Sequence, residues 1–361
     1  REENSEWLED YALFRAIKES KGGGSWVGWD ENLRNREERA IADAKKELKP
    51  AVDRFVFYQF LFFRQWDALH AYANSKNIQI IGDIPIFVSY DSSDVWVNPE
   101  LFFLDEQKLP TVAAGVPPDY FSKTGQLWGN PLYKWTQHKA ENYAWWVKRM
   151  RAILNTVDIV RLDHFRGFAG YWEVPANEET AINGRWVSGP GADLFQTLKD
   201  ELGELAIIAE DLGEITPDVF ELRDQFNLPG MKIFQFAFSD NNNPFLPHHY
   251  PENCVAYTGT HDNNTARGWY ETASEHEKDF ARRYLSVDGS DFSWDLIRRL
   301  WKSKASFVLA PMQDLLNLGE EARMNYPGKL GGNWAWRMKN DALSPGLKEK
   351  IYILNEERKR V

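Results

Sequence analysis

Cysteine is almost absent from this sequence of 361 residues, which contains a single copy, Cys254. One cysteine cannot form an internal disulfide, and this composition favours a reducing compartment. Cys254 lies in the apolar run CVAY. We therefore interpret it as a small buried hydrophobic residue rather than as a reactive thiol.

Long apolar runs and a surplus of basic charge are also missing. No stretch of about 18 apolar residues occurs, so no membrane span and no membrane partner are predicted. Lysine and arginine number 43 against 54 aspartates and glutamates, a net charge of -11, which argues against a nucleic-acid partner. The chain begins REENSEWLEDY, without a methionine or a targeting pattern, and we expect a processed product or a fragment. A cytoplasmic protein is predicted, with a plastid as the alternative.

Aromatic residues, in contrast, are abundant. They make up 14% of the chain, with 16 Trp, 14 Tyr and 22 Phe. Many of them must form the core, but sugar rings also pack their C–H faces on aromatic side chains. Aromatic residues beside many carboxylates are therefore typical of a carbohydrate site, although composition alone does not separate this reading from a plain core.

The first 76 residues have a helical pattern and are predicted to form a helical insertion region, 1–76. Helices are predicted at 6–20, 31–50 and 51–76, and the turn KGGGSW (21–26) separates the first two. Pro50 marks the start of the third helix, because a proline is tolerated in the first turn. This third helix is rich in aromatic residues, and we expect it to be largely buried.

The pattern changes after residue 76, where six short apolar runs alternate with helical segments such as 141–156 and 192–203. Continuous apolar strands that alternate with helices indicate a parallel sheet covered on both faces. Six such units predict an α/β fold of the (β/α)8 TIM-barrel type. The predicted strands lie at 78–88, 157–165, 205–213, 231–238, 254–262 and 304–316.

The domain organisation follows from these runs. We predict that 77–361 carries barrel strands three to eight, and that the N-terminal barrel units are absent from this chain, because no further strands are found in 1–75. The segment 89–140 is too long for an ordinary loop and is rich in Pro, Gly, Asp and aromatic residues. It is predicted to form an inserted subdomain at the barrel mouth.

Charged residues end several of the predicted strands, and the C-terminal strand ends of such barrels form the active-site face. Asp163 lies between Arg161 and Arg166, whose positive charge favours an ionised carboxylate that can act as a nucleophile. Glu210 directly follows an apolar run in IIAEDLG, and this drier setting suits a general acid. Asp262 in YTGTHDNNT is a third carboxylate. Each alone could be a structural ion pair, but two carboxylates about 5 Å apart can perform retaining chemistry on a glycosidic bond.

Longer motifs carry a family resemblance across about 50–340. The segments VRLDHFRGF, IIAEDLG, THDNNT, GDIPIFV, GVPPDYFS, GQLWGNPLY and GNWAWR resemble those of the 4-α-glucanotransferases, the amylomaltases or disproportionating enzymes of glycoside hydrolase family 77 in the α-amylase clan. The resemblance implies that Asp163 is the nucleophile, Glu210 the general acid/base and Asp262 the transition-state stabiliser. It implies no metal and no cofactor. The substrate-binding residues it implies are Asp83, Tyr120, Phe121, Trp128, Asn130, Pro131, Arg161, His261, Asn333 and Trp334.

The predicted activity is retaining transfer of α-1,4-glucan segments through a covalent glucosyl-enzyme intermediate. The donors implied are malto-oligosaccharides and glucans derived from starch or glycogen, with glucose or maltose as acceptor. Two alternatives stay open at this point. An α-1,4-glucan hydrolase of the same clan would use the same three carboxylates with water as acceptor. A non-catalytic glucan-binding protein would follow if a barrel with six strands is incomplete, since its open edges are a hazard.

Overall fold

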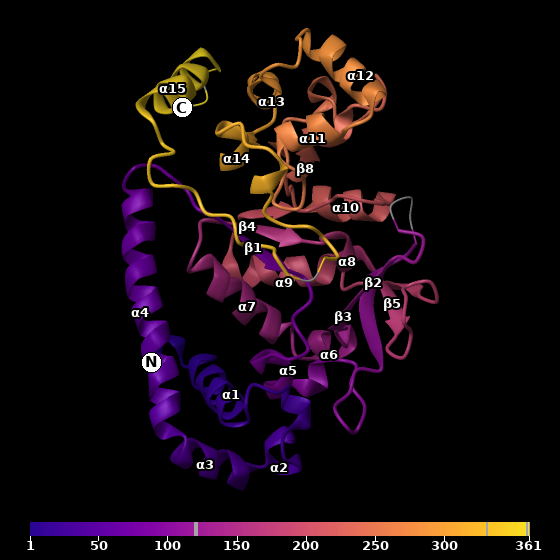
Figure 1. Ribbon diagram of the computed structural model, residues 1–361. Coiled ribbons are helices and arrows are strands. Elements are labelled where there is room, and N and C mark those ends of the chain that lie inside the picture. Colours follow the sequence, from indigo (N-terminus) through magenta and orange to yellow (C-terminus); the bar gives the residue numbers. More distant parts are fainter. Residues whose placement is uncertain (119–121, 330, 359, 361) are drawn as a thin grey trace. The chain divides into compact units, whose positions relative to one another are not determined.

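The computed structural model describes residues 1–118, 122–329, 331–358 and 360. It forms two compact units, Arg1–Phe226 and Asn227–Val361, whose helices and strands are labelled in Figure 1. Among the described residues, none of the helices is both long enough and apolar enough to cross a bilayer.

The first unit begins with helices, as the sequence predicts. After the short turn η1 (Glu2–Asn4), these are α1 (Leu8–Ser20), α2 (Glu31–Arg34), α3 (Glu38–Glu47) and α4 (Lys49–Asn74), with η2 (Trp26–Gly28) after the glycine turn. Gly22 and Gly23 both have positive φ angles, of 71° and 84°, which explains why the chain breaks there. Pro50 lies in the first turn of α4, as expected.

The prediction that the third helix is largely buried is wrong. The buried side chains of α4 (Lys49–Asn74) are Val52 and Val56. The helix packs along α1 and α3 (Figure 1), but its aromatic residues are spread around its circumference, so one packed side cannot cover them all. The large apolar side chains that are 50% to 62% exposed are Phe57, Tyr58, Phe60, Phe62, Leu69 and Tyr72.

Three parallel strands follow in the first unit, at the positions predicted from the apolar runs. They are β1 (Ile81–Pro85), β4 (Ile159–Asp163) and β7 (Ile207–Ala209), hydrogen-bonded in the order β1-β4-β7. The helices α7 (Ala144–Leu154) and α9 (Ala192–Leu202) precede β4 and β7, and α10 (Pro217–Gln225) follows β7. This βα alternation brings the carboxyl ends of the three strands to the same edge.

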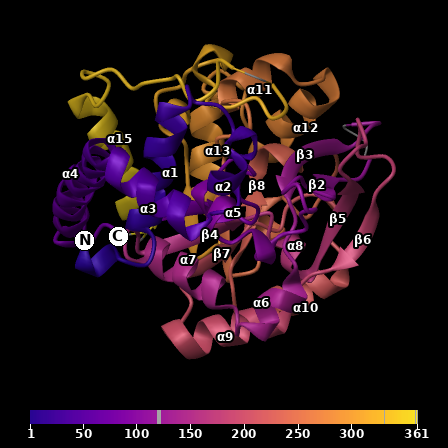
Figure 2. The ribbon, with the colours of Figure 1, turned by 90° about the horizontal axis from the view of Figure 1, so that it is seen from below.

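A second, antiparallel sheet lies in the same unit (Figure 2). Its strands are β2 (Val112–Val116), β3 (Gln126–Pro131), β5 (Gly170–Pro175) and β6 (Arg185–Ser188), in the order β3-β2-β5-β6. The sequence did not predict β5 and β6, so the sheet extends beyond the proposed insertion 89–140. The short helices of this region are α5 (Ser93–Val97), η3 (Pro99–Leu101), α6 (Trp135–Ala140) and α8 (Arg166–Ala169).

The second unit repeats the parallel pattern with β8 (Gly230–Ile233), β9 (Cys254–Tyr257) and β10 (Phe307–Leu309), in the order β8-β9-β10. These strands also fall within the predicted runs. Its helices are α11 (Ala266–Thr272), α12 (Glu275–Leu285), α13 (Phe292–Trp301), α14 (Met312–Leu315) and α15 (Pro345–Arg358), with short turns η4 (Phe234–Ala237), η5 (Pro247–His249) and η6 (Glu320–Ala322).

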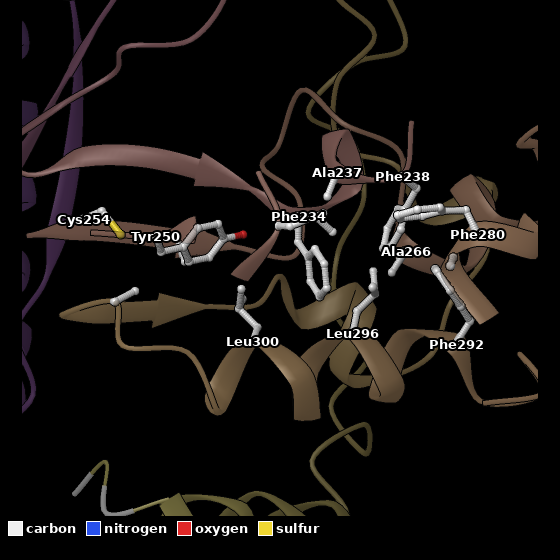
Figure 3. Close-up of a cluster of buried hydrophobic side chains, with 14 residues drawn as sticks. Phe234, Ala237, Phe238, Tyr250, Cys254, Ala266, Phe280, Phe292, Leu296 and Leu300 are labelled. Carbon is white, nitrogen blue, oxygen red and sulfur yellow. The ribbon is translucent and has the colours of Figure 1, made fainter. Parts of the chain in front are cut away.

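The core of the second unit combines aromatic and aliphatic side chains, as Figure 3 shows. Leu296 and Leu300 of α13 point toward the strands, and Phe234 points toward Leu296. Cys254 belongs to this cluster, with 1% of its surface exposed, and its thiol donates to the carbonyl of Pro251 at 3.2 Å. The interpretation of Cys254 as a buried hydrophobic residue is therefore confirmed.

Candidate active site

Arg161 bridges two of the predicted site carboxylates in the first unit. Its Nη1 lies 2.8 and 2.7 Å from the two carboxylate oxygens of Asp83, and 3.0 Å from Oδ1 of Asp163. The register explains this, because Asp83 of β1 lies opposite Arg161 of β4, and residues 161 and 163 point to the same face of their strand. The sheet therefore brings together three residues that the sequence separates by up to 80 positions.

The charge of Arg161 is fixed by these neighbours. Its side chain is 9% exposed, while those of Asp83 and Asp163 are 43% and 41% exposed. Burial by itself lowers the pKa of the Arg161 guanidinium, but the carboxylates of Asp83, Asp163 and Glu210 outweigh burial and raise it. A permanent positive charge thus lies beneath two carboxylates that remain open to solvent.

Glu210 follows β7 directly and has different surroundings. Its Oε2 accepts a hydrogen bond from the backbone N–H of His164 at 2.7 Å, and its Oε1 accepts one from the N–H of Leu212 at 3.0 Å. Burial raises the pKa of Glu210 to about 8; the positive charge of Arg161 opposes this rise and the negative charge of Asp163 adds to it. At neutral pH the carboxyl therefore carries a proton, which is the state that a general acid needs.

His164 connects these two carboxylates through its backbone. It has a left-handed conformation, with φ of 53°, which is uncommon for a residue other than glycine. The chain turns there at the end of β4, and the N–H of the residue after Asp163 reaches Glu210. Burial lowers the pKa of the His164 imidazole to about 4, so the ring is neutral at pH 7.

The predicted glucan-contacting segment on β3 is only partly open. Trp128 is 39% exposed and its ring meets the imidazole of His164 edge to face, with centroids 4.8 Å apart. Asn130 donates from its side chain to the carbonyl of Val88 at 2.9 Å, so it holds the segment after β1. Pro131 is buried, so its predicted contact with a substrate finds no support in this geometry. Tyr120 and Phe121, also predicted to bind substrate, lie outside the described residues.

The third predicted carboxylate, Asp262, lies in the second unit within a dense local network. Its Oδ2 is 3.3 Å from Nε2 of His261. The side chain of Asn325 donates to Oδ1 of Asp262 at 2.6 Å, and Nη2 of Arg323 donates to the Asp262 carbonyl at 2.8 Å. The N–H of Asn325 also donates to the His261 carbonyl at 3.1 Å. Arg323 and Asn325 were not among the predicted site residues.

Asn333 and Trp334 lie beside this network in the same unit. Asn333 accepts from the N–H of Tyr326 at 3.1 Å and donates to the carbonyl of Lys329 at 2.9 Å, so it closes the loop between them. Trp334 has a left-handed conformation, with φ of 59°, and is 61% exposed. Its ring lies 5.0 Å from that of His261, so an open aromatic face adjoins the residue next to Asp262.

In each unit, a carboxylate at or after the end of a parallel strand has a histidine next to it in the sequence, and that histidine contacts an exposed tryptophan. Open carboxylates on a buried arginine and a protonated carboxyl next to them are the groups that glycosidic chemistry uses. Aromatic faces such as those of Trp128 and Trp334 suit sugar rings. The fold and these groups define a carbohydrate-active enzyme of the α/β-barrel class.

The chain belongs to the 4-alpha-glucanotransferase family of glycoside hydrolase family 77, whose family model matches residues 1–343. It is 52% identical to the 4-alpha-glucanotransferase of Thermus thermophilus, over all of this chain and 74% of that protein. It is 47% identical to the chloroplastic/amyloplastic 4-alpha-glucanotransferase of Arabidopsis thaliana, over 92% of this chain and 58% of that protein.

Comparison with a solved structure agrees with this family membership. The amylomaltase from Streptococcus agalactiae, in complex with acarbose, superposes with a TM-score of 0.96 at 41% identity, over 99% of this chain and 73% of that one. The predicted family, the TIM-type barrel fold with insertions and the 4-alpha-glucanotransferase function are confirmed. The alternatives of a hydrolase and of a non-catalytic glucan-binding protein are not favoured.

Proposed function

We propose that this enzyme moves α-1,4-glucan segments by a retaining mechanism in which Asp163 is the nucleophile, Glu210 the general acid/base and Asp262 the transition-state stabiliser. The observation that carries the first two roles is the contrast between their surroundings. Asp163 contacts the charged Arg161 and its side chain is 41% exposed, whereas desolvation raises the pKa of Glu210 to about 8, so that Glu210 carries a proton at pH 7. Two carboxyl groups kept in opposite protonation states are what double displacement requires.

In the first step, a carboxylate oxygen of Asp163 attacks the anomeric carbon of the donor and the bond from that carbon to the glycosidic oxygen breaks. Glu210 gives its proton to the departing oxygen. The product is a glucosyl ester on Asp163, and Glu210 is left ionised. Asp262 would favour the positively charged, oxocarbenium-like transition state through its own negative charge.

In the second step, the 4-hydroxyl of an acceptor sugar attacks the anomeric carbon of the ester. The ionised Glu210 takes the hydroxyl proton, the ester bond breaks and Asp163 is restored. Two inversions give net retention. The N–H groups of His164 and Leu212 accompany Glu210 through both steps, and they favour the ionised form that takes the acceptor's proton.

The substrates we infer are malto-oligosaccharides and starch- or glycogen-derived glucans as donors, with glucose or maltose as acceptors. This choice is supported by the family, by the names of its relatives and by the exposed rings of Trp128 and Trp334. We infer a cytoplasmic location, with a plastid as the alternative; the bacterial and the chloroplastic relatives respectively support these two.

The test begins with maltotriose, whose products are followed by chromatography. Transfer yields glucose and a ladder of longer maltodextrins, whereas hydrolysis yields glucose and maltose. Asp163→Asn and Asp262→Asn should each lower the rate at least about 10³-fold. Glu214→Gln, which removes an exposed carboxyl four residues after Glu210, should leave the rate unchanged.

A second donor isolates the role of Glu210. Fluoride leaves without a proton, so Glu210→Gln should lose activity about 10²- to 10⁴-fold on maltotriose and much less in forming the ester from α-maltosyl fluoride. Equal losses on both donors would refute general acid catalysis by Glu210. Wild-type transfer by Asp163→Asn would refute its role as the nucleophile.

A further inference from the structure

A buried carboxylate outside the proposed catalytic set lies in the second unit. Asp314 of α14 has no exposed surface. Burial raises its pKa to about 6, against the effect of its two hydrogen bonds, and no charged group contributes to this shift. A buried carboxylate without a cationic partner is unfavourable compared with an apolar side chain of similar volume. The hydrogen bonds that Asp314 accepts should therefore explain why a carboxylate is buried at this position.

Asp314 holds both ends of one loop. Its Oδ2 accepts a hydrogen bond from the hydroxyl of Thr258 at 2.6 Å, and its Oδ1 accepts one from the N–H of Ala266 at 2.7 Å. Thr258 directly follows β9, and Ala266 begins α11. Thr258 and Ala266 are fully buried as well. One rigid carboxylate thus fixes the distance between the two ends of the segment 258–266.

The segment between those ends carries His261 and Asp262. It is short and tightly bonded within itself, since Asn263 accepts from both the N–H and the hydroxyl of Thr260 at 2.8 and 2.9 Å. The hydroxyl of Thr260 in turn accepts from the N–H of Asp262 at 3.3 Å. Because of these bonds, a displacement of either end of the loop should also displace Asp262.

The residue before Asp314 supports the other side of the same network. Gln313 is buried, and its side-chain amide donates to the carbonyl of Ala322 at 3.2 Å. Ala322 immediately precedes Arg323, which together with Asn325 holds Asp262. Neighbouring residues of α14 thus hold both segments that determine the position of Asp262.

We propose that Asp314 is a positioning residue for Asp262, which it holds by accepting one hydrogen bond from each end of the 258–266 loop. This inference rests on the proposed role of Asp262 as transition-state stabiliser. A small misplacement of a group that acts in the transition state lowers kcat with little effect on substrate binding. A residue with a purely structural role would instead lower the amount of folded enzyme.

The test compares four variants in steady-state transfer from maltotriose, at a temperature well below unfolding. Asp314→Ala should lower kcat about 10- to 100-fold and change KM less than about twofold. Asp314→Asn should stay within about threefold of wild type, because its amide oxygen can accept from Ala266 and its NH2 can donate to the Thr258 hydroxyl. Thr258→Val combined with Asp314→Asn removes that second partner and should behave like Asp314→Ala.

The fourth variant, Leu300→Ala, is the matched control. Leu300 is fully buried in the same unit, in the cluster of Figure 3, and its truncation removes packing but none of the hydrogen bonds that hold the loop. Its kcat should stay within about twofold of wild type. Hydrogen exchange of the amides in 258–266 should accelerate in Asp314→Ala and not in Leu300→Ala.

The outcomes separate this inference from the proposed function. A wild-type kcat in Asp314→Ala beside an inactive Asp262→Asn would overturn the positioning role and leave the mechanism intact. An active Asp262→Asn would overturn both. A kcat in Asp314→Asn as low as in Asp314→Ala would also refute the argument, because the amide can replace both bonds. Should Asp314→Ala fail to fold, the comparison of Asp314→Asn with the double variant (Thr258→Val combined with Asp314→Asn) tests the positioning role instead.

Discussion

Replacing Glu210 with glutamine should change how the stability of the protein depends on pH. The pKa of Glu210 is about 8 in the folded chain, against an ordinary value of 4.5, because burial disfavours the ionised form. Between these two values the unfolded chain has released the proton and the folded chain keeps it. The unfolded state then binds fewer protons, so the free energy of unfolding falls as the pH rises.

The magnitude follows from the size of the shift. Each pH unit within the window contributes about 1.4 kcal/mol. From pH 5 to pH 8 the wild type should therefore lose about 4 kcal/mol relative to Glu210→Gln, whose amide does not titrate. The amide also places an NH2 group against the N–H of His164 or Leu212, which costs about 1–3 kcal/mol. That penalty does not vary with pH, so the change with pH isolates the titration of Glu210.

The assay is urea unfolding at pH 5, 6, 7 and 8, followed by tryptophan fluorescence for both proteins. The difference in unfolding free energy, variant minus wild type, should rise steadily across the series. Glu214→Gln is the control, since it removes an exposed carboxyl nearby, and its difference should stay constant. A flat difference for Glu210→Gln would show that Glu210 ionises as an exposed glutamate does. The assignment of Glu210 as the acid on grounds of burial would then fail.

Two further changes test the charged and the aromatic parts of the site. Arg161→Lys keeps the charge but shortens the side chain, so we expect it to lose one of the contacts that Nη1 makes to Asp83 and Asp163. Loss of one charge-assisted bond, about 1.5–3 kcal/mol, predicts a fall in kcat of about 10- to 150-fold on maltotriose, and an unchanged kcat would contradict the bridging role. Trp334→Ala should raise KM for maltotriose about 2- to 12-fold with kcat preserved, while Tyr352→Ala, an equally exposed aromatic on α15, should have no effect.

The sequence was informative where one local pattern determined the structure. Continuous apolar runs predicted all six parallel strands, and the polar residues that ended them predicted the carboxylates of the site. The strand β5 was missed because it pairs with β2 across more than 50 residues, which no local pattern reveals. The strand β6 pairs with β5 over a short separation, but neither segment forms one of the continuous apolar runs from which strands were predicted. The exposure of α4 was mispredicted for a related reason. Its composition shows that it is apolar, but the partners available to cover it determine how much is buried.

The residues that support the site were harder to find than the residues that compose it. Arg323, Asn325 and Asp314 were not predicted as site residues, and each acts through a bond across about 50 or more positions of the chain. The pairing of Asp83 with Arg161 also depends on strand register, which the sequence does not specify. Such contacts arise only when the fold brings distant segments together.

The proposed division of labour between Asp163 and Glu210 therefore depends on the surroundings of each carboxyl rather than on residue type. Asp163 contacts a full positive charge at 3.0 Å, and a charged donor strongly favours the anion that must attack carbon. Glu210 accepts from two backbone N–H groups, which hold its orientation and favour its ionised form, but burial outweighs them and raises its pKa. One of these donors is the N–H of His164, the residue directly after Asp163. The left-handed turn at His164 therefore positions Glu210 relative to Asp163 through the backbone.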